Sequence, residues 1–240
     1  LSTFNYNRYP EKNTGRMVTT QSGVTWDLEA KMTPKWSISI SDAASQLQSE
    51  ITNGWVDDNG NTNSYQNSNL SEAITIVAGS YNAVQQRKFG TQGMLSGFQF
   101  RSARAMLRGM YSTGDKTLAI LAGTGSGKSY GFQIGSLISI VEQRLAGTLN
   151  RTHSIFLYPR VALMDDQRNT MEELLENCNK FLAGIEIRWI TDGGSNLKKD
   201  YKLKIDPSIP DKKLQKLSAP KLIRAFYGSD SQCPHLVFAN

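Results

Sequence analysis

The sequence predicts an α/β fold in which a parallel sheet is covered by helices on both faces. Between residues 100 and 240, short apolar runs alternate with longer helical patterns, and strands that alternate with helices form parallel sheets. A glycine-rich loop at 122–128 separates one such run from a long helical pattern. Phosphate-binding loops occupy this position between a strand and a helix.

Five segments are expected to be helices and four to be strands. The first helix covers 41–51, with Ser41 as the N-cap that accepts a hydrogen bond from a free N–H group. The other helices are expected over 72–87, 100–111, 129–145 and 162–182. Strands buried on both faces read as short continuous apolar runs, and such runs lie at 117–121, 154–158, 185–190 and 236–238.

The chain is expected to have an accessory extension and one main domain. Residues 52–69 contain six Asn, two Gly and two Asp, a composition typical of a linker. We therefore expect residues 1–70 to form an N-terminal extension and 71–240 to form the main lobe.

Composition and residue spacing argue against a membrane span, a signal peptide and a metal finger, and they leave the function open. No apolar run approaches the roughly 20 residues that cross a bilayer, and the first residues lack the pattern of a signal peptide. The two cysteines and two histidines are not spaced as a metal finger. A net charge of +6 is compatible with a polyanionic partner, and equally with an ordinary soluble protein.

The segment Ala122-Gly-Thr-Gly-Ser-Gly-Lys-Ser129 has the pattern of a phosphate-binding loop. Its glycines allow the backbone to approach a ligand closely, and N–H groups at the start of the next helix bind phosphate oxygens. Lys128 is expected against the β- and γ-phosphates of ATP, and the Ser129 hydroxyl as a ligand of Mg²⁺. The predicted nucleotide-binding residues of the loop are Gly123, Thr124, Gly125, Ser126, Gly127, Lys128 and Ser129.

Five segments resemble motifs of one family. The loop is similar to motif I of superfamily 2 helicases, and Gly97-Phe98-Gln99 resembles the Q motif upstream of it. Tyr158-Pro-Arg-Val-Ala-Leu-Met-Asp-Asp-Gln167 resembles motif Ia as it occurs in the Lhr-like branch of DEAD/DEAH-box proteins. Trp189–Gly194 resembles the following strand and double glycine, and Pro234–Asn240 resembles the segment before the DExD/H box.

The resemblance covers about residues 95–240 and implies a first RecA-like lobe of a P-loop NTPase. It implies that Gln99 reads the adenine edge and that Phe98 packs against the base. The positions that would contact nucleic acid are Arg160, Gln167, Gly193, Gly194 and Asn240. Arg160 and Ala239 replace threonines that bond the nucleic-acid backbone in the family, and only Arg160 can pair with a phosphate instead.

These motifs stop before the acidic pair that the family uses for hydrolysis, because the chain ends at Asn240. We therefore expect it to bind ATP but to hydrolyse ATP weakly by itself. Further domains or subunits would carry motif II and the second RecA-like lobe.

A basic insertion is expected over 195–233, with nine basic and four acidic residues. Its surplus of positive charge favours contact with a phosphate backbone. A solvated segment whose lysines only maintain solubility is the alternative.

The resemblance implies an ATP-dependent helicase or translocase of the bacterial cytoplasm that acts on nucleic acid, on DNA rather than RNA. An anti-phage role of the DISARM type is compatible with it. Two other interpretations stay open: a module that binds ATP or DNA without hydrolysis, and a P-loop kinase, which does not explain residues 158–167.

Overall fold

The computed structural model describes residues 16–21, 24–29, 38–56, 62–63, 68–111, 118, 128–192, 194–228 and 233–240. The chain divides into two compact units, Leu1–Lys35 and Trp36–Asn240. The first unit contains a hairpin in which β1 (Arg16–Gln21) pairs antiparallel with β2 (Val24–Glu29). The sequence had not indicated this hairpin.

The second unit begins with four helices, α1 (Ile40–Asn53), α2 (Ser68–Phe89), α3 (Gly97–Tyr111) and α4 (Lys128–Leu145). All four occur where the apolar periodicity predicts them. Two short antiparallel pairs accompany the helices: β3 (Ile38–Ser39) with β6 (Met94–Leu95), and β4 (Trp55–Val56) with β5 (Thr62–Asn63).

The first helix begins at Ile40, and its N-cap lies two residues earlier than predicted. Ser39, not Ser41, is the N-cap, because its Oγ accepts a hydrogen bond of 3.0 Å from the Asp42 N–H. This allows Ile40 to be the first helical residue, and its side chain is buried with Ala43 and Leu47 on the same face. The extra buried isoleucine explains why the earlier serine caps the helix.

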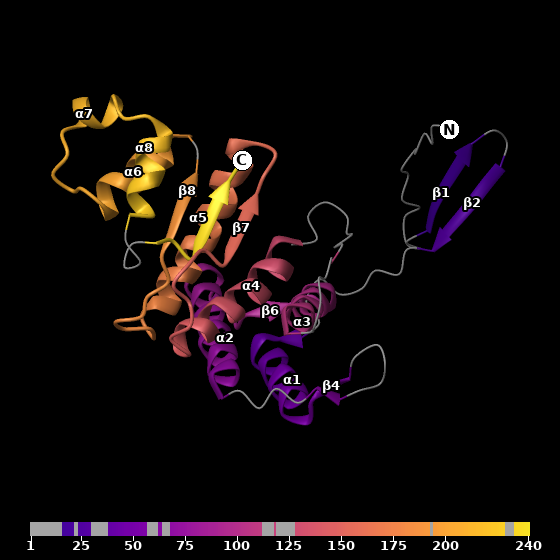
Figure 1. Ribbon diagram of the computed structural model, residues 1–240. Helices are drawn as coiled ribbons and strands as arrows, with labels where there is room; N and C mark the ends of the chain where they lie inside the picture. Colours follow the sequence, from indigo (N-terminus) through magenta and orange to yellow (C-terminus); the bar gives the residue numbers. More distant parts are fainter. Residues whose placement is uncertain are drawn as a thin grey trace. The chain divides into compact units, whose positions relative to one another are not determined.

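A three-stranded parallel sheet follows, made of β7 (Ser154–Leu157), β8 (Trp189–Asp192) and β9 (Leu236–Ala239) in the order β7-β9-β8. Helix α5 (Val161–Asn179) connects β7 to β8. The helices α6 (Gly194–Lys204), α7 (Asp211–Gln215) and α8 (Ala219–Phe226) connect β8 to β9. Figure 1 shows these three helices together beside β8, on the side away from β7.

Strand β9 is buried on both faces. Leu236 and Phe238 belong to the large core that also contains residues of α1 to α5, whereas Val237 and Ala239 belong to a second core under α6, α7 and α8. Alternate residues of a strand face opposite sides of its sheet, so helices cover both faces at the centre of the sheet. This confirms the predicted α/β class, a parallel sheet flanked by helices.

Two of the four predicted strands are not confirmed as predicted. The strand predicted over 185–190 is wrong in its bounds, since β8 begins at Trp189. The strand predicted over 117–121 lies outside the described residues except for Leu118, which is 45% exposed. The predicted domain boundary at residue 70 stays a prediction, although α1 and α2 share residues of one core.

In the described part of the chain, no helix combines the length and the apolar character that a membrane span requires.

Candidate nucleotide and nucleic-acid site

Helices α3 and α4 start side by side because two glycines of α4 face α3. A Cβ atom at Gly131 would lie 2.9 Å from the Cβ of Ser102 and 3.7 Å from the Gln99 carbonyl oxygen. A Cβ atom at Gly135 would lie 3.1 Å from the Ala103 carbonyl oxygen. Only glycine permits this approach, so the packing sets the first turn of α4 against the first turn of α3.

Gln99 forms a capping box at the start of α3. Its Oε1 accepts a hydrogen bond of 2.9 Å from the Ser96 N–H, and its own N–H donates to the Ser96 Oγ at 3.2 Å. The residue is 2% exposed, whereas Phe98 is half-buried. The two predicted adenine-binding residues therefore lie in the first turn of α3, next to the start of α4.

The start of α4 provides the chemistry expected of a phosphate site. The helix begins at Lys128, and N–H groups in the first turn of a helix have no intrahelical acceptor. The positive end of the helix dipole adds attraction for an anion. Ser129 in this turn is half-buried, while Gly123 to Gly127 and the Lys128 side chain lie outside the described residues.

The predicted nucleic-acid contacts follow the ends of the three strands. In the sheet, Leu157 and Asp192 are both paired with Ala239, so all three strands end at the same edge. Arg160 follows β7 and is exposed, and Asn240 follows β9 and is also exposed. Gly194 begins α6 directly after β8, and Gly193 lies outside the described residues.

Gln167 contacts the interior of the unit as well as its own helix. Its Oε1 accepts a hydrogen bond of 3.4 Å from Gln133 of α4, and its Nε2 donates to the Asp166 carboxylate at 3.2 Å. Gln133 is fully buried, and its side chain opposes the rise that burial causes in the pKa of Tyr158. Gln167 thus connects the phosphate-loop helix to the helix that follows Arg160, and its contact with nucleic acid stays a prediction.

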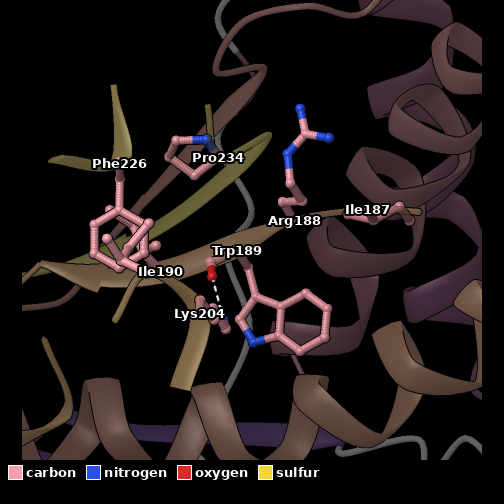
Figure 2. Close-up of a pocket in the computed structure, with 8 residues that line it drawn as sticks. Ile187, Arg188, Trp189, Ile190, Lys204, Phe226 and Pro234 are labelled. Atoms are coloured by element: carbon pink, nitrogen blue, oxygen red, sulfur yellow. Dashed lines mark hydrogen bonds between the residues drawn. The ribbon is translucent and has the colours of Figure 1, made fainter. Parts of the chain in front are cut away.

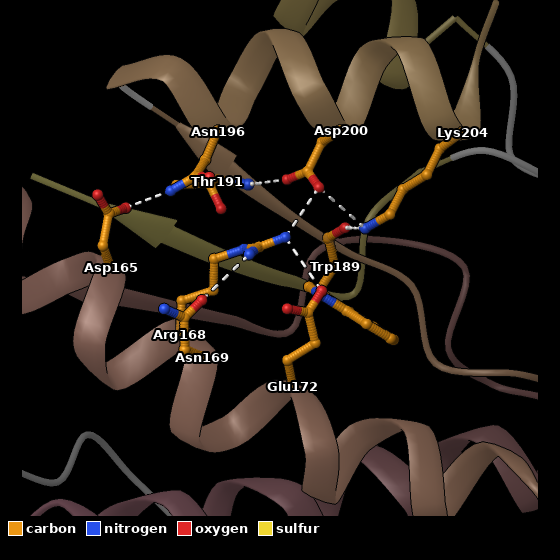
Figure 3. A network of polar contacts seen from close by, with 9 residues as sticks. All are labelled: Asp165, Arg168, Asn169, Glu172, Trp189, Thr191, Asn196, Asp200 and Lys204. Carbon is orange, nitrogen blue, oxygen red and sulfur yellow. Dashed lines mark hydrogen bonds and ion pairs between the residues drawn. The ribbon is translucent and has the colours of Figure 1, made fainter. Parts of the chain in front are cut away.

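A buried polar network, which the sequence did not indicate, joins α5 to α6 and β8 (Figure 3). The Arg168 Nη2 lies 3.1 Å from Asp200 Oδ1 and 3.0 Å from Glu172 Oε1. The other carboxylate oxygen of Asp200 accepts a hydrogen bond of 2.9 Å from the Thr191 N–H of β8. No local pattern marks such a pair, because the two residues are 32 positions apart.

Two further contacts extend the network. The Asn196 side chain donates to Asp165, in the second turn of α5. The Lys204 ammonium donates to the Trp189 carbonyl oxygen, lies 4.5 Å from the centre of the Trp189 ring and 3.6 Å from Asp200. Burial lowers the pKa of Lys204 while the Asp200 carboxylate raises it. Asp200 and Lys204 together bond the outer edge of β8, which leaves less of that edge free to pair with another chain.

A cavity of about 370 Å³ lies near the beginnings of β8 and β9 (Figure 2). It is lined by residues of β8 and the segment before it, the ends of α6 and α8, and the segment before β9: Ile187, Arg188, Trp189, Ile190, Lys204, Ile205, Phe226 and Pro234. None of these is a predicted site residue. The cavity therefore lies at the edge of the sheet opposite the predicted site.

Comparison with known families agrees with this geometry. Residues 99–214 match the family model of the DEAD/DEAH box helicases. The match begins at Gln99 and includes the phosphate loop, Arg160 and Gln167. No curated protein and no solved structure matches the chain closely enough to be called similar.

The match supports a DEAD/DEAH box helicase lobe in this part of the chain and is consistent with the RecA-like fold. It indicates binding of ATP and of nucleic acid at the level of the family. The matched segment extends through α6 to Leu214 of α7, so residues 195–214 of the basic insertion lie inside it.

Proposed function

We propose that the chain is the ATP-binding lobe of a helicase or translocase that acts on DNA. The observation that carries the proposal is the packing of α3 on α4, which sets Gln99 beside the first turn of the helix that follows the phosphate loop. A family match over the same residues supports it independently.

In this proposal the nucleotide lies over the first turns of α3 and α4. The N–H groups of residues 123–127 and of the α4 start surround the phosphates, and Lys128 contacts the β- and γ-phosphates. The Ser129 hydroxyl holds Mg²⁺, which neutralises charge on the phosphates when bound. Gln99 and Phe98 hold the adenine.

The nucleic-acid strand crosses the edge where β7, β9 and β8 end. Exposed Arg160 pairs with a phosphate, while Gly193, Gly194 and Asn240 contact the backbone from the neighbouring strand ends. In open α/β sheets ligands bind outside the carboxyl ends of the strands. Gln167, held by Gln133 of α4, supports the connection between the two sites.

The finer assignment follows from the resemblance of residues 158–167 to the Lhr-like branch. In this assignment the protein is a bacterial cytoplasmic enzyme with a role in defence against phage. Motif II and the second RecA-like lobe are supplied by further domains or subunits.

Affinity for nucleic acid in different nucleotide states tests the proposal. A motor changes its affinity for the polymer between the ATP-bound and ADP-bound states. We expect the dissociation constants of the complete gene product for single-stranded DNA, measured with a non-hydrolysable ATP analogue and with ADP, to differ several-fold, and we expect Lys128→Ala to remove the difference. Equal affinities in both states, with nucleotide bound, would contradict the proposal, and tighter binding of RNA than DNA would correct the substrate.

A further inference from the structure

The four acidic residues of the basic insertion do not neutralise its lysines evenly. Asp200 is buried and bonded to Arg168 and Thr191. Asp211 pairs with Lys202 at 2.6 Å, and Asp206 accepts a hydrogen bond from the Ser208 hydroxyl. The fourth, Asp230, lies outside the described residues.

Six cations of α6, α7 and α8 and the residue after α7 are exposed, and their side chains form no ion pair or hydrogen bond within the described ranges. They form what we call the basic surface: Lys199, Lys212, Lys213, Lys216, Lys221 and Arg224. Elsewhere in the unit, Arg87 and Lys88 share Glu173, and Arg104 pairs with Glu50. The other exposed cations of the described part of this unit without a side-chain partner, Arg101, Arg151 and Arg160, lie on separate elements, so the largest group of unpaired positive charge lies on these three helices.

The helices that carry the basic surface form one packed body. Leu197, Leu214, Leu222 and Phe226 are buried in one core, so the lysines beside them in sequence point outward from the same body. The Lys198 ammonium donates to the Gln215 carbonyl oxygen at 3.0 Å and to its Oε1 at 3.1 Å. This contact fixes the end of α7 against the first turns of α6.

The position of that contact relates the basic surface to the predicted nucleic-acid edge. Helix α6 starts directly after β8, at the edge where Arg160 and Asn240 lie. Lys199 lies in the second turn of α6, and Lys216 directly follows Gln215. Helix α8 ends at Phe226, beside the cavity at the opposite edge, so its first turn with Lys221 lies toward the same edge as Lys199.

We propose that the basic surface contacts the phosphate backbone of the nucleic acid bound at the adjoining strand ends, through the part of the surface nearest that edge, Lys199, Lys216 and Lys221. This inference rests on the proposed function, and it adds a second contact region outside the strand-end loops. The surface consists of lysines with one arginine, which suit phosphate contacts more than base readout, so the contact is independent of sequence. Single-stranded and duplex nucleic acid share this chemistry, and the experiment distinguishes them.

The test measures the affinity of the full chain for labelled single-stranded and duplex DNA over a series of salt concentrations. Each phosphate contact contributes about 0.9 to the slope of log affinity against log salt for duplex, and about 0.7 for a single strand. We expect Lys199→Gln/Lys216→Gln to lower the slope by up to about 2 on the form that binds there. The control Arg151→Gln/Lys180→Gln removes two exposed charges near the starts of β7 and β8, at the opposite edge, and should leave the slope unchanged.

The outcomes separate this inference from the proposed function. If the wild-type chain binds and Arg160→Ala weakens binding, but the lysine double variant behaves like the control on both DNA forms, the inference is wrong and the proposed function stands. If the wild-type chain binds neither form at low salt, both are wrong. Equal unfolding midpoints of all variants ensure that the slope reports on contacts and not on folding.

Discussion

Arg168 and Asp200 form an ion pair whose side chains are only 3% and 1% exposed, with 3.1 Å between Nη2 and Oδ1. The pair connects α5, which follows Arg160, to α6, which begins at the second residue of the double glycine. Because Asp200 also accepts from the Thr191 N–H, one carboxylate connects a strand and two helices. The two loops predicted to contact nucleic acid are therefore held by a common buried group.

Removing this carboxylate should destabilise the fold strongly. Asp200→Ala leaves the Arg168 guanidinium buried with only Glu172 and Asn169 as side-chain partners and leaves the Thr191 N–H without its acceptor. We expect the free energy of unfolding in urea to fall by about 3 kcal/mol. The matched control is Asp211→Ala, whose pair with Lys202 is exposed and should change stability by less than about 1 kcal/mol. Equal losses in the two variants would contradict the network.

Two glycine substitutions should have opposite effects on stability, because Gly131 packs closely against α3 whereas Gly79 in α2 has open space around it. Gly131→Ala places a Cβ 2.9 Å from the Ser102 Cβ, so the helices must separate, with a loss of about 1–3 kcal/mol and weaker ATP binding. Gly79→Ala in α2 meets no atom within 4 Å, and it should stabilise the helix by about 0.5–1 kcal/mol. Urea unfolding measures the change in stability, and nucleotide titration measures the change in ATP affinity. Unchanged ATP affinity in Gly131→Ala would mean that nucleotide binding does not depend on this packing.

Two substitutions at Gln99 separate its capping from its predicted contact with adenine. Glutamate also forms a capping box, so Gln99→Glu should keep the bond to the Ser96 N–H while it loses the amide donor and weakens ATP binding about tenfold. Because the position is only 2% exposed, burial of the carboxylate should also lower the free energy of unfolding. Gln99→Ala should lose both the capping bond and the amide donor, with about 1 kcal/mol of stability. If the glutamate variant binds ATP as tightly as the wild type, Gln99 has a structural role only.

Stability should fall with acidification because of His235. The side chain is fully buried, its ring nitrogens lie 3.2 Å from the Arg188 N–H nitrogen and 3.0 Å from its Nη2, and burial together with Arg188 lowers its pKa to about 3. The unfolded chain binds a proton below about pH 6.5 that the folded chain does not bind. The stabilisation is therefore complete above that pH and is lost as pH falls toward 3, by at most about 1.4 kcal/mol per pH unit.

Unfolding in urea at about pH 7 and about pH 5 tests this effect, because His235 changes its protonation in the unfolded chain across that interval. The wild-type protein should lose more stability across the interval than His235→Gln, which cannot take up the proton. The difference is assigned to His235 because His153, whose pKa burial also lowers, is present in both proteins. Parallel losses would contradict a neutral buried histidine.

Local pattern predicted the elements of the fold better than their contacts. Apolar periodicity was sufficient for α1 to α5, because each helix has a continuous buried face. The start of β8 was wrong because Ile185 and Ile187 are apolar without pairing in the sheet. The Asn179 side chain bonds both the N–H and the carbonyl of Ile187, at 2.7 and 2.9 Å, and substitutes for a neighbouring strand.

In the candidate site, too, the sequence predicted individual residues better than the contacts between them. The motifs placed Gln99, Arg160 and Asn240 on loops or helix starts, and the structure brings Arg160 and Asn240 to one edge and Gln99 to the start of α4. The Arg168–Asp200 pair depends on the packing of α6 beside α5, and no spacing in the sequence encodes it. Likewise, the sequence does not tell which lysines of the insertion stay unpaired. This depends on contacts such as the hydrogen bond from Lys198 to the Gln215 side chain.

ATP hydrolysis by the complete gene product, measured with and without single-stranded DNA, duplex DNA and RNA and compared with Lys128→Ala, distinguishes a motor from a binding module. We expect DNA to stimulate turnover several-fold and the Lys128 substitution to abolish it, which would support a nucleic-acid motor. If ATP binds but turnover is absent, or indifferent to every polymer, the motor is contradicted and a module that only binds ATP takes its place.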